Sequence, residues 1–275
     1  MSDAEQRSPI SPTAHYTAAV WARHGLSHPA LATPTGRLMF HGMRAPMAVS
    51  KLLGGPTLED FLLARHQLID ALLERAIEAG EVTQVIEIAA GLSARGWRFA
   101  GRYGDRITYL ETDLPAMVSR KREALEEAGT LGPLHRVVPL DALSEDGPQS
   151  LAAVVAELDS AGGLAIVTEG LLSYLDRAGV DGLWRRIART LSGFEHGLYL
   201  SDLHLASENT GIGADAFVWM LGAFVRGKVE LHFEDEPEAL AALERAGFAE
   251  AHLPRGDHSG GARGARSVRV IEARI

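Results

Sequence analysis

Two neighbouring segments constrain the fold of this chain more than any other feature. Residues 81–96 read EVTQVIEIAAGLSARG, and residues 107–115 read ITYLETDLP. The first is an aliphatic run that ends at Glu87 and turns on small residues, and the second ends in Glu111 and Asp113. A Rossmann-like sheet holds a nucleoside in this way, with a tight turn under the ligand and a carboxylate beyond the next strand for the ribose hydroxyls. The pattern therefore predicts a nucleoside-containing ligand.

Strand-like and helical segments alternate from residue 82 onward. We predict strands at 82–88, 107–111, 136–140, 164–168 and 197–201, and helices at about 94–103, 114–128, 151–160 and 177–192. Alternation of this length favours an α/β fold, with a parallel sheet and helices on both faces. A helix at 238–246 and two late strands at 248–254 and 267–274 predict a C-terminal antiparallel hairpin. A Rossmann-like, seven-stranded class I methyltransferase fits this order better than a nicotinamide-dependent dehydrogenase.

The chain divides into a cover and a main domain. Residues 1–56 show no strand–helix alternation, and we expect short helices there that form an N-terminal cover. Residues 57–275 form the main domain, which opens with a helix at 57–79 capped by Thr57 and Asp60. An apolar lid insertion is expected at about 207–227, around Phe217, Trp219, Met220 and Phe224.

Composition excludes several classes of function. A net charge of −9 argues against nucleic acid or an anionic membrane as the main partner. The chain has no cysteine, and its eleven histidines lack metal-ligand spacing, so we expect no metal. We see no signal peptide and no run of about 18 apolar residues. The expectation is a cytoplasmic protein with a small-molecule acceptor as its partner, and a homodimer is left open.

Arg65 stands where a charged side chain is least expected. The apolar stripe of the helix at 57–79 comprises Leu58, Phe61, Leu62, Leu68, Ile69, Leu72 and Leu73. At 100° per residue, Arg65 falls in the middle of that stripe. An unpaired buried charge costs several kcal/mol, so this arginine must find an anion. A carboxylate of the ligand, a structural pair with Glu87 or Asp113, and a snorkelling side chain are the alternatives.

The turn at 89–93 lets the backbone approach a ligand at the end of the first strand. Alanines occupy two positions where a GxGxxG motif would have glycine, which disfavours a bound pyrophosphate. A ligand with a ribose and no phosphates fits better, and S-adenosylmethionine is the commonest one. Glu87, at the end of an apolar strand, either meets a cation or hydrogen-bond donor or is a solvated residue at the rim.

Other acids follow the predicted strands. Asp113 precedes a Leu-Pro pair, so it can bind the ribose or cap the next helix, and Glu111 is the competing ribose ligand. Asp141 follows the third strand, where it can lie near a nucleoside base or cap a helix. Glu169 ends the fourth strand, at the edge where open α/β sheets bind ligands, and it is either a pocket acid or a solvated loop acid.

Six segments together resemble the leucine carboxyl methyltransferase family. They read SPTAHYT (11–17), FLLARHQLI (61–69), EIAAGLSARGW (87–97), YLETDLPAMVSRK (109–121), LDAL (140–143) and TEGLLSYL (168–175). They look most like the bacterial branch of tetracenomycin-type polyketide O-methyltransferases. The resemblance implies S-adenosylmethionine-dependent O-methylation, often of a carboxyl group, in polyketide biosynthesis. The family commonly has GAGLDTR at the first turn, where this chain has Ala89 for the first glycine and Ser93 for the aspartate.

The resemblance also implies roles for matching residues. Arg65 would bind the carboxylate of the cofactor, and Asp113 would hold the ribose hydroxyls. Asp141 and the Ala142 backbone would meet the adenine, and Glu169 would lie near the methionine amino group. The full set of expected cofactor contacts is Arg65, Glu87, Ala89, Ala90, Gly91, Asp113, Leu114, Asp141, Ala142 and Glu169.

The acceptor decides whether a catalytic base is needed. Methyl transfer is an in-line displacement, in which alignment and desolvation can supply much of the catalysis. A carboxylate acceptor is already ionised near neutral pH, whereas a phenol or alcohol calls for a base such as His15 or His204. Tyr16 and Tyr174 complete the candidate catalytic residues, as side chains of the cover and the acceptor site. Apolar residues in the cover and the insertion favour a hydrophobic or polycyclic acceptor.

Two other functions remain open from the sequence. One is a nicotinamide-dependent oxidoreductase, which the incomplete glycine pattern and the terminal hairpin disfavour. The other is a catalytically silent S-adenosylmethionine-binding protein that acts through partners.

Overall fold

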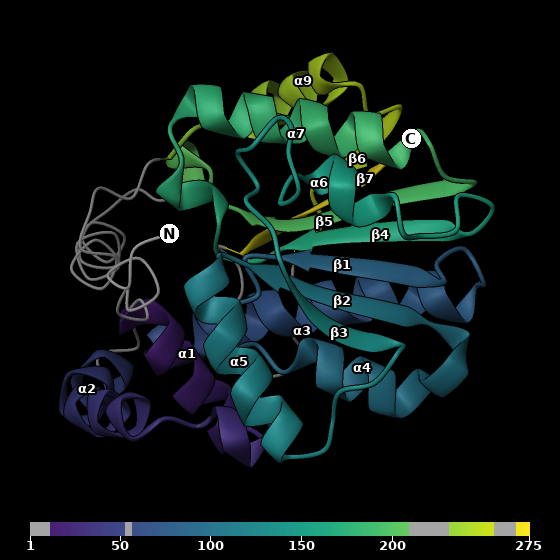
Figure 1. Cartoon of the computed structure of the whole chain (residues 1–275). Helices are drawn as coiled ribbons and strands as arrows, with labels where there is room; N and C mark the ends of the chain where they lie inside the picture. The colour runs from purple at the N-terminus through teal and green to yellow at the C-terminus, as the bar shows by residue number, and fades with distance from the viewer. Residues whose placement is uncertain (1–11, 53–56, 209–230, 256–267) are drawn as a thin grey trace.

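A seven-stranded sheet forms the centre of the molecule (Figure 1). The computed structural model describes residues 12–52, 57–208, 231–255 and 268–275. Its strands are β1(Gln84–Ile88), β2(Thr108–Asp113), β3(His135–Pro139), β4(Gly163–Thr168), β5(His196–Leu203), β6(Glu250–His252) and β7(Arg269–Arg274), in the order β3-β2-β1-β4-β5-β7-β6. β1 to β5 pair in parallel, and β7 pairs antiparallel with both β5 and β6. The predicted sheet and its antiparallel C-terminal part are confirmed.

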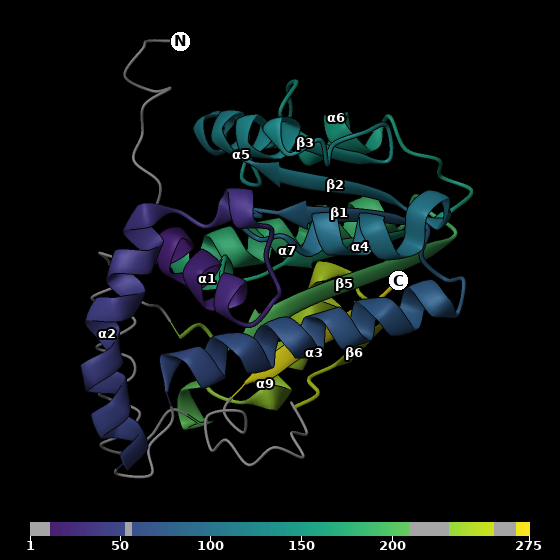
Figure 2. The ribbon, with the colours of Figure 1, turned by 90° about the horizontal axis from the view of Figure 1, so that it is seen from below.

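Helices cover both faces of the sheet, as Figures 1 and 2 show. They are α1(Pro12–Arg23), α2(Pro34–Leu52), α3(Leu58–Glu78), α4(Arg95–Tyr103), α5(Pro115–Glu127), α6(Leu151–Val155), α7(Arg177–Leu191) and α9(Glu236–Ala246). α3, α4 and α5 pack on one face, whereas α6, α7 and α9 pack on the other. α1 and α2 lie at the carboxyl edge of the parallel strands.

The alternation of side chains along the strands explains this three-layer arrangement. Val85, Tyr109 and Val167 contribute to the core under α3, whereas Ile86 and Ile166 contribute to the core under α7. All five side chains are buried. Burial on both faces is why the parallel strands read as continuous apolar runs. Each fully buried aliphatic side chain of this kind stabilises the fold by about 1.5–3 kcal/mol.

Two predicted helices differ from the observed ones. The helix expected at 151–160 ends at Val155, because the Gln84 side chain accepts from Asp159 N–H at 2.8 Å and donates to the Asp159 carbonyl at 2.7 Å. Those bonds hold the following segment in a non-helical connection. In the N-terminal cover, where short helices were expected, α2 extends over 19 residues. Thr33 caps its start by accepting the Gly36 N–H at 3.0 Å.

The helix at 57–79 forms as predicted. Thr57 accepts the Asp60 N–H at 3.1 Å, and Arg65 is buried on the inner side of α3. The apolar insertion expected at 207–227 lies outside the described residues, apart from Ser207 and Glu208. No described helix is long and apolar enough to cross a membrane.

Candidate functional site

A cavity of about 370 Å³ lies at the carboxyl ends of β1, β2 and β4. It is lined by Thr13, Ala14, Thr17, Trp21, Arg65, Glu87, Ala89, Ala90, Gly91, Leu92, Ser93, Asp113, Leu114, Met117, Glu169, Gly170, Leu171 and Tyr174. Its volume falls within the range of small-molecule sites, and it lies at the sheet edge where open α/β folds bind ligands. Eight of the ten expected cofactor contacts are therefore among its lining residues.

The turn after β1 has a strained backbone. Ala89 has φ = 54°, and it is the one non-glycine residue in the described part of the chain with positive φ. A left-handed conformation costs an L-residue about 1–2 kcal/mol. The turn is held by two backbone donors: Ala90 N–H to the Thr112 carbonyl at 2.9 Å, and Gly91 N–H to Asp113 Oδ2 at 2.8 Å. Strain of this kind, stored where a ligand would lie, is typical of functional sites.

Asp113 ends β2 and faces the cavity. Its Oδ1 accepts the Leu114 N–H at 2.8 Å, and its Oδ2 accepts the Gly91 N–H. The N-cap residue of α5 is Leu114, whose own side chain makes no capping bond, and Asp113 lies one residue before it. The alternative that Asp113 is the N-cap of this helix is therefore wrong. Each carboxylate oxygen keeps one lone pair for a hydroxyl group. Burial raises the pKa of Asp113, and the two N–H donors oppose that rise.

Glu111 is not at the cavity. Its side chain is buried with Lys121, with which it forms an ion pair, and it contacts His135 Nε2 at 2.6 Å. Burial would raise the pKa of Glu111, but Lys121 and His135 lower it. Glu111 is therefore excluded as the ribose ligand, because both oxygens face partners inside the protein.

Arg65 is paired, but not with the acids that the sequence suggested. Its Nε donates to Glu169 Oε1 at 3.0 Å, and its Nη1 donates to Asp202 Oδ2 at 3.1 Å. Nη2 donates no hydrogen bond to another described residue, and it lies 3.0 Å from where a Cβ on Gly170 would be. Burial would lower the pKa of Arg65, but Asp202 and Glu169 raise it. The guanidinium is held rigidly at the cavity with one nitrogen left to bind an anion.

Glu87 and Glu169 belong to a buried ionic network centred on Arg95. Arg95 is fully buried and donates to Glu87 Oε1 at 2.5 Å, to Asp70 Oδ1 at 2.6 Å and to Glu169 Oε2 at 2.5 Å. Tyr109 donates its hydroxyl to Glu87 Oε2 at 2.9 Å. Glu87 is thus a buried, paired acid at the cavity floor, and the alternative of a solvated rim residue is wrong.

The charges of this network stabilise its carboxylates. Burial would raise the pKa of Glu169, but His66 and Arg95 hold it well below the usual range. Burial would likewise lower the pKa of Arg95, but Glu87 and Asp70 raise it well above its usual value. Each group therefore keeps its charge although water is excluded.

Sequence reasoning missed four residues of this network, namely His66, Asp70, Arg95 and Asp202. Two signals were available. Asp70 follows Arg65 on the same inner side of α3, and Asp202 lies near the end of the otherwise mostly apolar strand β5. Charges on buried faces of different elements must meet one another, although the sequence does not say which pairs form.

A smaller side cavity of about 40 Å³ adjoins the first at Arg65. Its lining includes three of the candidate catalytic residues, Tyr16, Tyr174 and His204. His204 stacks on the Phe61 ring at 5.1 Å, and its Nε2 is 3.7 Å from Asp202 Oδ2. Burial lowers the pKa of His204, and Asp202 opposes that effect.

Three other expected site residues lie outside both cavities. The fourth catalytic candidate, His15, contacts Thr33 Oγ1 through Nδ1 at 2.8 Å and lines neither cavity. Asp141 accepts the Leu143 N–H at 2.9 Å within its own loop, and the Ala142 carbonyl accepts from Arg186 Nε at 3.2 Å. The adenine contacts implied for Asp141 and Ala142 stay predictions, because neither residue reaches the cavity.

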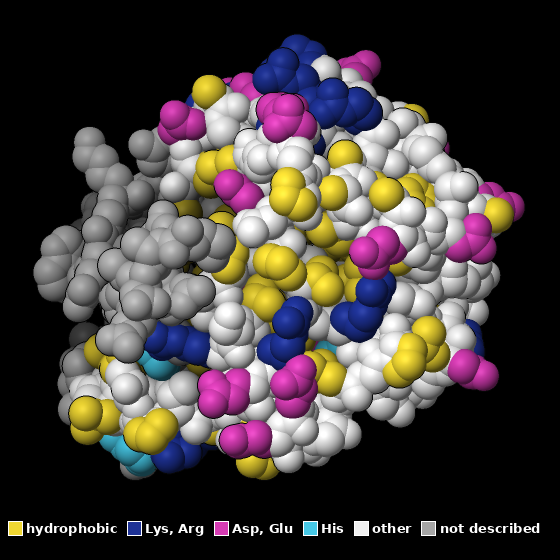
Figure 3. Space-filling view, in the orientation of Figure 1, with side chains coloured by type: hydrophobic (Ala, Val, Ile, Leu, Met, Phe, Trp, Pro, Cys, Tyr) yellow, Lys and Arg dark blue, Asp and Glu magenta, His cyan; other side chains and the backbone are white. Residues whose placement is uncertain are grey.

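The face seen in Figure 3 carries apolar side chains across its middle, with charged side chains mostly above and below them. Leu114 and Leu143 are among the exposed large apolar residues of the molecule. Within the described ranges, no group of three His, Asp or Glu side chains is arranged to hold a metal ion.

Comparisons with known proteins identify the fold. A protein from Thermobifida fusca that is provisionally named a methyltransferase superposes on this chain with a TM-score of 0.62 and 14% sequence identity. The superposition covers 96% of this chain and 97% of the Thermobifida fusca chain. A DUF574 family protein from Streptomyces avermitilis superposes with a TM-score of 0.61 at 14% identity, over 97% and 99%. The fold is that of class I methyltransferases.

Sequence relatives match a shorter part of the chain. Proteins from Streptomyces coelicolor and Rhodococcus jostii, both provisionally named S-adenosyl-L-methionine-dependent methyltransferases, are 36% and 33% identical over 140 and 150 residues. These matches cover 50% and 54% of this chain, and 48% and 49% of the relatives, so the alignments span about half the length of those proteins. The family model for leucine carboxyl methyltransferase matches residues 28–188, more than half of the chain. The chain therefore belongs to the leucine carboxyl methyltransferase family.

Proposed function

We propose that this protein is an S-adenosylmethionine-dependent O-methyltransferase that acts on a carboxyl or hydroxyl group of a small, hydrophobic, polyketide-like acceptor. One observation carries the proposal. A single cavity holds a buried guanidinium, Arg65, over β4 and β5, and a carboxylate, Asp113, at the end of β2, with the strained turn after β1 between them. A zwitterionic nucleoside has the complementary groups at matching positions, because its carboxylate pairs with the guanidinium and its ribose hydroxyls pair with the carboxylate of Asp113.

The residues present fit such a ligand. Arg65 Nη2 can donate to its carboxylate, and Glu169 can accept from its amino group. Asp113 keeps lone pairs for the two ribose hydroxyls, and Gly91 provides the left-handed backbone of the turn, with φ = 50°. When bound, S-adenosylmethionine supplies an electrophilic methyl group. The role of the chain is to align the acceptor and exclude water.

The side cavity supports an apolar acceptor. Leu58, Leu62 and Tyr16 line it next to Arg65, and all three are buried. An acceptor that enters here replaces water with apolar contacts, which favours hydrophobic molecules. The motif resemblance to polyketide O-methyltransferases is in line with this chemistry.

Calorimetry with S-adenosylhomocysteine, NAD and NADP tests the proposal. We expect micromolar binding of S-adenosylhomocysteine and none of the nicotinamide nucleotides. Binding of NAD or NADP in preference would contradict the proposal. S-adenosylhomocysteine release during incubation with S-adenosylmethionine and acceptors distinguishes an enzyme from a silent binding protein.

Arg65 is the residue to vary in that experiment. Arg65→Ala should weaken S-adenosylhomocysteine binding by about 10-fold or more, equivalent to about 1.4 kcal/mol. Arg65→Lys keeps a charge beside Glu169 and Asp202 while losing the forked geometry, so it should bind weakly yet stay folded. Arg106→Ala, which removes an exposed arginine, is the matched control. Unchanged affinity in both Arg65 variants would remove this residue from the site.

A further inference from the structure

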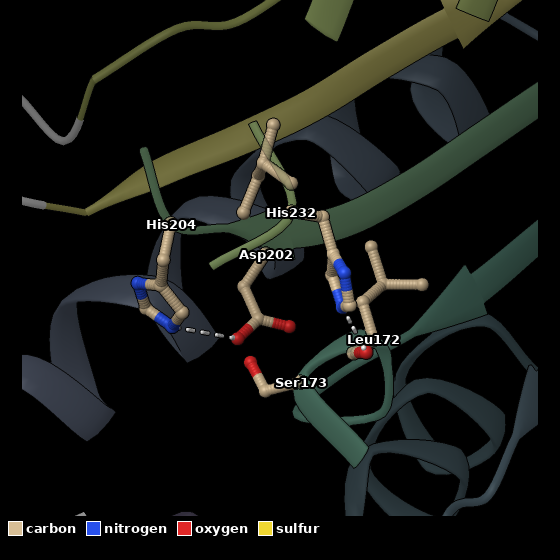
Figure 4. A pocket seen from close by; sticks show the side chains of 6 residues that line it. Leu172, Ser173, Asp202, His204 and His232 are labelled. Carbon is tan, nitrogen blue, oxygen red and sulfur yellow. Dashed lines mark hydrogen bonds and ion pairs between the residues drawn. The ribbon is translucent and has the colours of Figure 1, made fainter. Parts of the chain in front are cut away.

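The end of β5 carries a histidine–aspartate pair next to the side cavity (Figure 4). Asp202 and His204 point toward one another there, with the Ser173 side chain beside them. Asp202 is held on both oxygens, because Oδ1 accepts the Gly170 N–H at 2.7 Å and Oδ2 accepts from Arg65 Nη1 at 3.1 Å. The carboxylate is therefore fixed, whereas His204 Nε2, at 3.7 Å, is too far from it for a hydrogen bond.

The charges around the cavities disfavour an anionic acceptor. Among the described residues that line the side cavity, Asp202 is the one acid and Arg65 is the one arginine or lysine. Of the acids that line the larger cavity, Glu87 and Glu169 are paired with the buried Arg95. Arg65 already meets two of these acids, and its remaining donor faces the proposed cofactor carboxylate. A carboxylate entering the side cavity would therefore lie beside Asp202 without a cation of its own, which the low dielectric of a buried site makes costly.

We infer that the side cavity receives a neutral hydroxyl group, from a phenol or alcohol, and that His204 is the general base for its methylation. The inference rests on the proposed function and narrows its acceptor to hydroxyl compounds. The hydroxyl oxygen forms a bond to the methyl carbon as the carbon–sulfur bond breaks, and that electron pair goes to sulfur. The hydroxyl proton goes to His204, and the product pair is a methyl ether and S-adenosylhomocysteine.

The neighbouring residues leave His204 as the base. His15 lines neither cavity, and the ring of His232 is engaged by Nε2 with the Leu172 carbonyl at 3.0 Å. Burial, with Glu59, raises the pKa of Tyr16 to about 12, so its hydroxyl stays protonated near neutral pH. The negative charge of Asp202, whose Oδ2 lies 3.7 Å from His204 Nε2, favours the imidazolium that forms on His204.

Size also limits what the side cavity admits. Its volume of about 40 Å³ is small beside the 370 Å³ of the larger cavity, so a compact end of the acceptor, such as a hydroxyl group and the carbon that bears it, fits there best. Tyr174, whose side chain is 45% exposed, lines both cavities and offers an aromatic surface there. A flat aromatic alcohol fits this arrangement.

The test compares 2-naphthol with 2-naphthoic acid as acceptors of the same shape. With S-adenosylmethionine, we expect the methyl ether of 2-naphthol and no methyl ester of 2-naphthoic acid. His204→Gln should lower kcat for 2-naphthol by about 100-fold or more and leave S-adenosylhomocysteine affinity unchanged. His196→Gln, at the exposed opposite end of the same strand, is the control and should keep full activity.

The pH profile gives a second readout. The groups that face His204 are Asp202 on β5, Arg65 on α3, Tyr16 on α1, Tyr174 on the short 3-10 helix η4(Leu172–Tyr174), and His232. Because burial holds the pKa of His204 below 6.5, kcat should be flat near neutral pH and fall only when the pH drops through that lowered value. His204→Gln should abolish this fall in its residual activity.

Three results would overturn the inference: ester formation in preference to ether, full activity of His204→Gln, or failure of both probes to bind the S-adenosylhomocysteine complex in calorimetry. The proposed function fails separately, when S-adenosylhomocysteine itself does not bind the wild-type protein. Binding of S-adenosylhomocysteine with formation of the ester alone would retain the methyltransferase and reject the hydroxyl acceptor.

Discussion

Arg65 and Arg95 are both buried, yet they differ in what their guanidinium groups have left to donate. Arg95 uses Nε, Nη1 and Nη2 on three different acids, so its bonds are complete within the protein. Arg65 uses Nε and Nη1 on two acids, and its Nη2 has no partner among the described residues. Arg95 therefore holds elements together, whereas Arg65 can also bind a ligand.

Replacement of Arg95 should show its structural role. Arg95→Leu would leave Asp70, Glu87 and Glu169 without their shared cation, and we expect a loss of about 3–5 kcal/mol in the free energy of unfolding. Arg106→Leu removes an exposed pair with Glu78, a long hydrogen bond to the Ile77 carbonyl and a contact with the Tyr103 ring, and should change that free energy by about 1 kcal/mol or less. Urea denaturation measures both. Equal stability of the two variants would show that the buried network contributes nothing.

Ala89 offers a test of strain at the ligand turn. Glycine adopts φ near 54° without the Cβ clash, so Ala89→Gly should stabilise the fold by about 0.5–1 kcal/mol, net of the backbone entropy of glycine. Ala90→Gly is the matched control, because Ala90 is buried and has no positive φ, and it should destabilise. Thermal denaturation of both variants decides the matter. A lower midpoint for Ala89→Gly would mean that the methyl group is needed for packing.

At the scale of elements, α3 connects the ligand cavity to the sheet through charges. It carries Arg65, His66 and Asp70 on its inner side, and these side chains meet partners on α4, on β5 and directly after β4. Apolar residues of the same stripe pack beneath α3, so the helix has both a hydrophobic and an ionic attachment. The stability that the ionic attachment contributes must depend on pH, because its carboxylates can be protonated.

The expected pH dependence follows from Glu169 and Asp70. Burial would raise the pKa of both acids, but His66 and the arginines lower it in the folded state. The unfolded chain then binds more protons than the folded one as the pH falls through the ordinary values of 4.5 and 3.8. The stabilisation from these pairs is therefore complete near neutral pH and is lost progressively below about pH 4.5.

Thermal midpoints between pH 7 and pH 3 measure this dependence. Asp70→Asn should unfold at lower temperature than wild type at neutral pH, and the difference should shrink as the pH falls, because the wild-type carboxylate is then being protonated. A difference that stays constant across the range would contradict the assignment of the network as the source of the acid sensitivity.

At the scale of the whole molecule, the N-terminal helices form part of the site. α1 contributes Thr13, Ala14, Thr17 and Trp21 to the larger cavity, and the Trp21 ring lies 4.8 Å from that of His66. α7 and α9 cover the opposite face of the sheet and line neither cavity. A ligand in the cavity should therefore couple α1 to the sheet edge.

Hydrogen exchange tests this coupling. On addition of S-adenosylhomocysteine, amides of α1 and of the turn after β1 should become more protected, because the ligand contacts both and suppresses their local opening. Amides of α9 serve as the internal control and should not change. Protection spread evenly over the chain would indicate general stabilisation, with no special role for α1.

Much of this architecture is encoded in local patterns. The alternation of apolar runs and helical stripes predicted the order of strands and helices, the terminal antiparallel pair, and the inward direction of Arg65. Periodicity of this kind depends only on which side chains avoid water, so it can be read one element at a time. The same logic placed Asp113 and Glu169 at the carboxyl edge of the sheet.

Tertiary contacts decided the rest, because the partner of a buried charge comes from a distant part of the chain. Glu87 and Glu111 are register partners on adjacent strands and face the same side, yet Arg95 meets the first and Lys121 the second. Gly96 leaves the space that Glu111 occupies, since a Cβ there would lie 2.3 Å from Glu111 Oε1. Which acid reaches a ligand therefore depends on strand register and helix packing, and the alternation of residues along one strand carries no information about either.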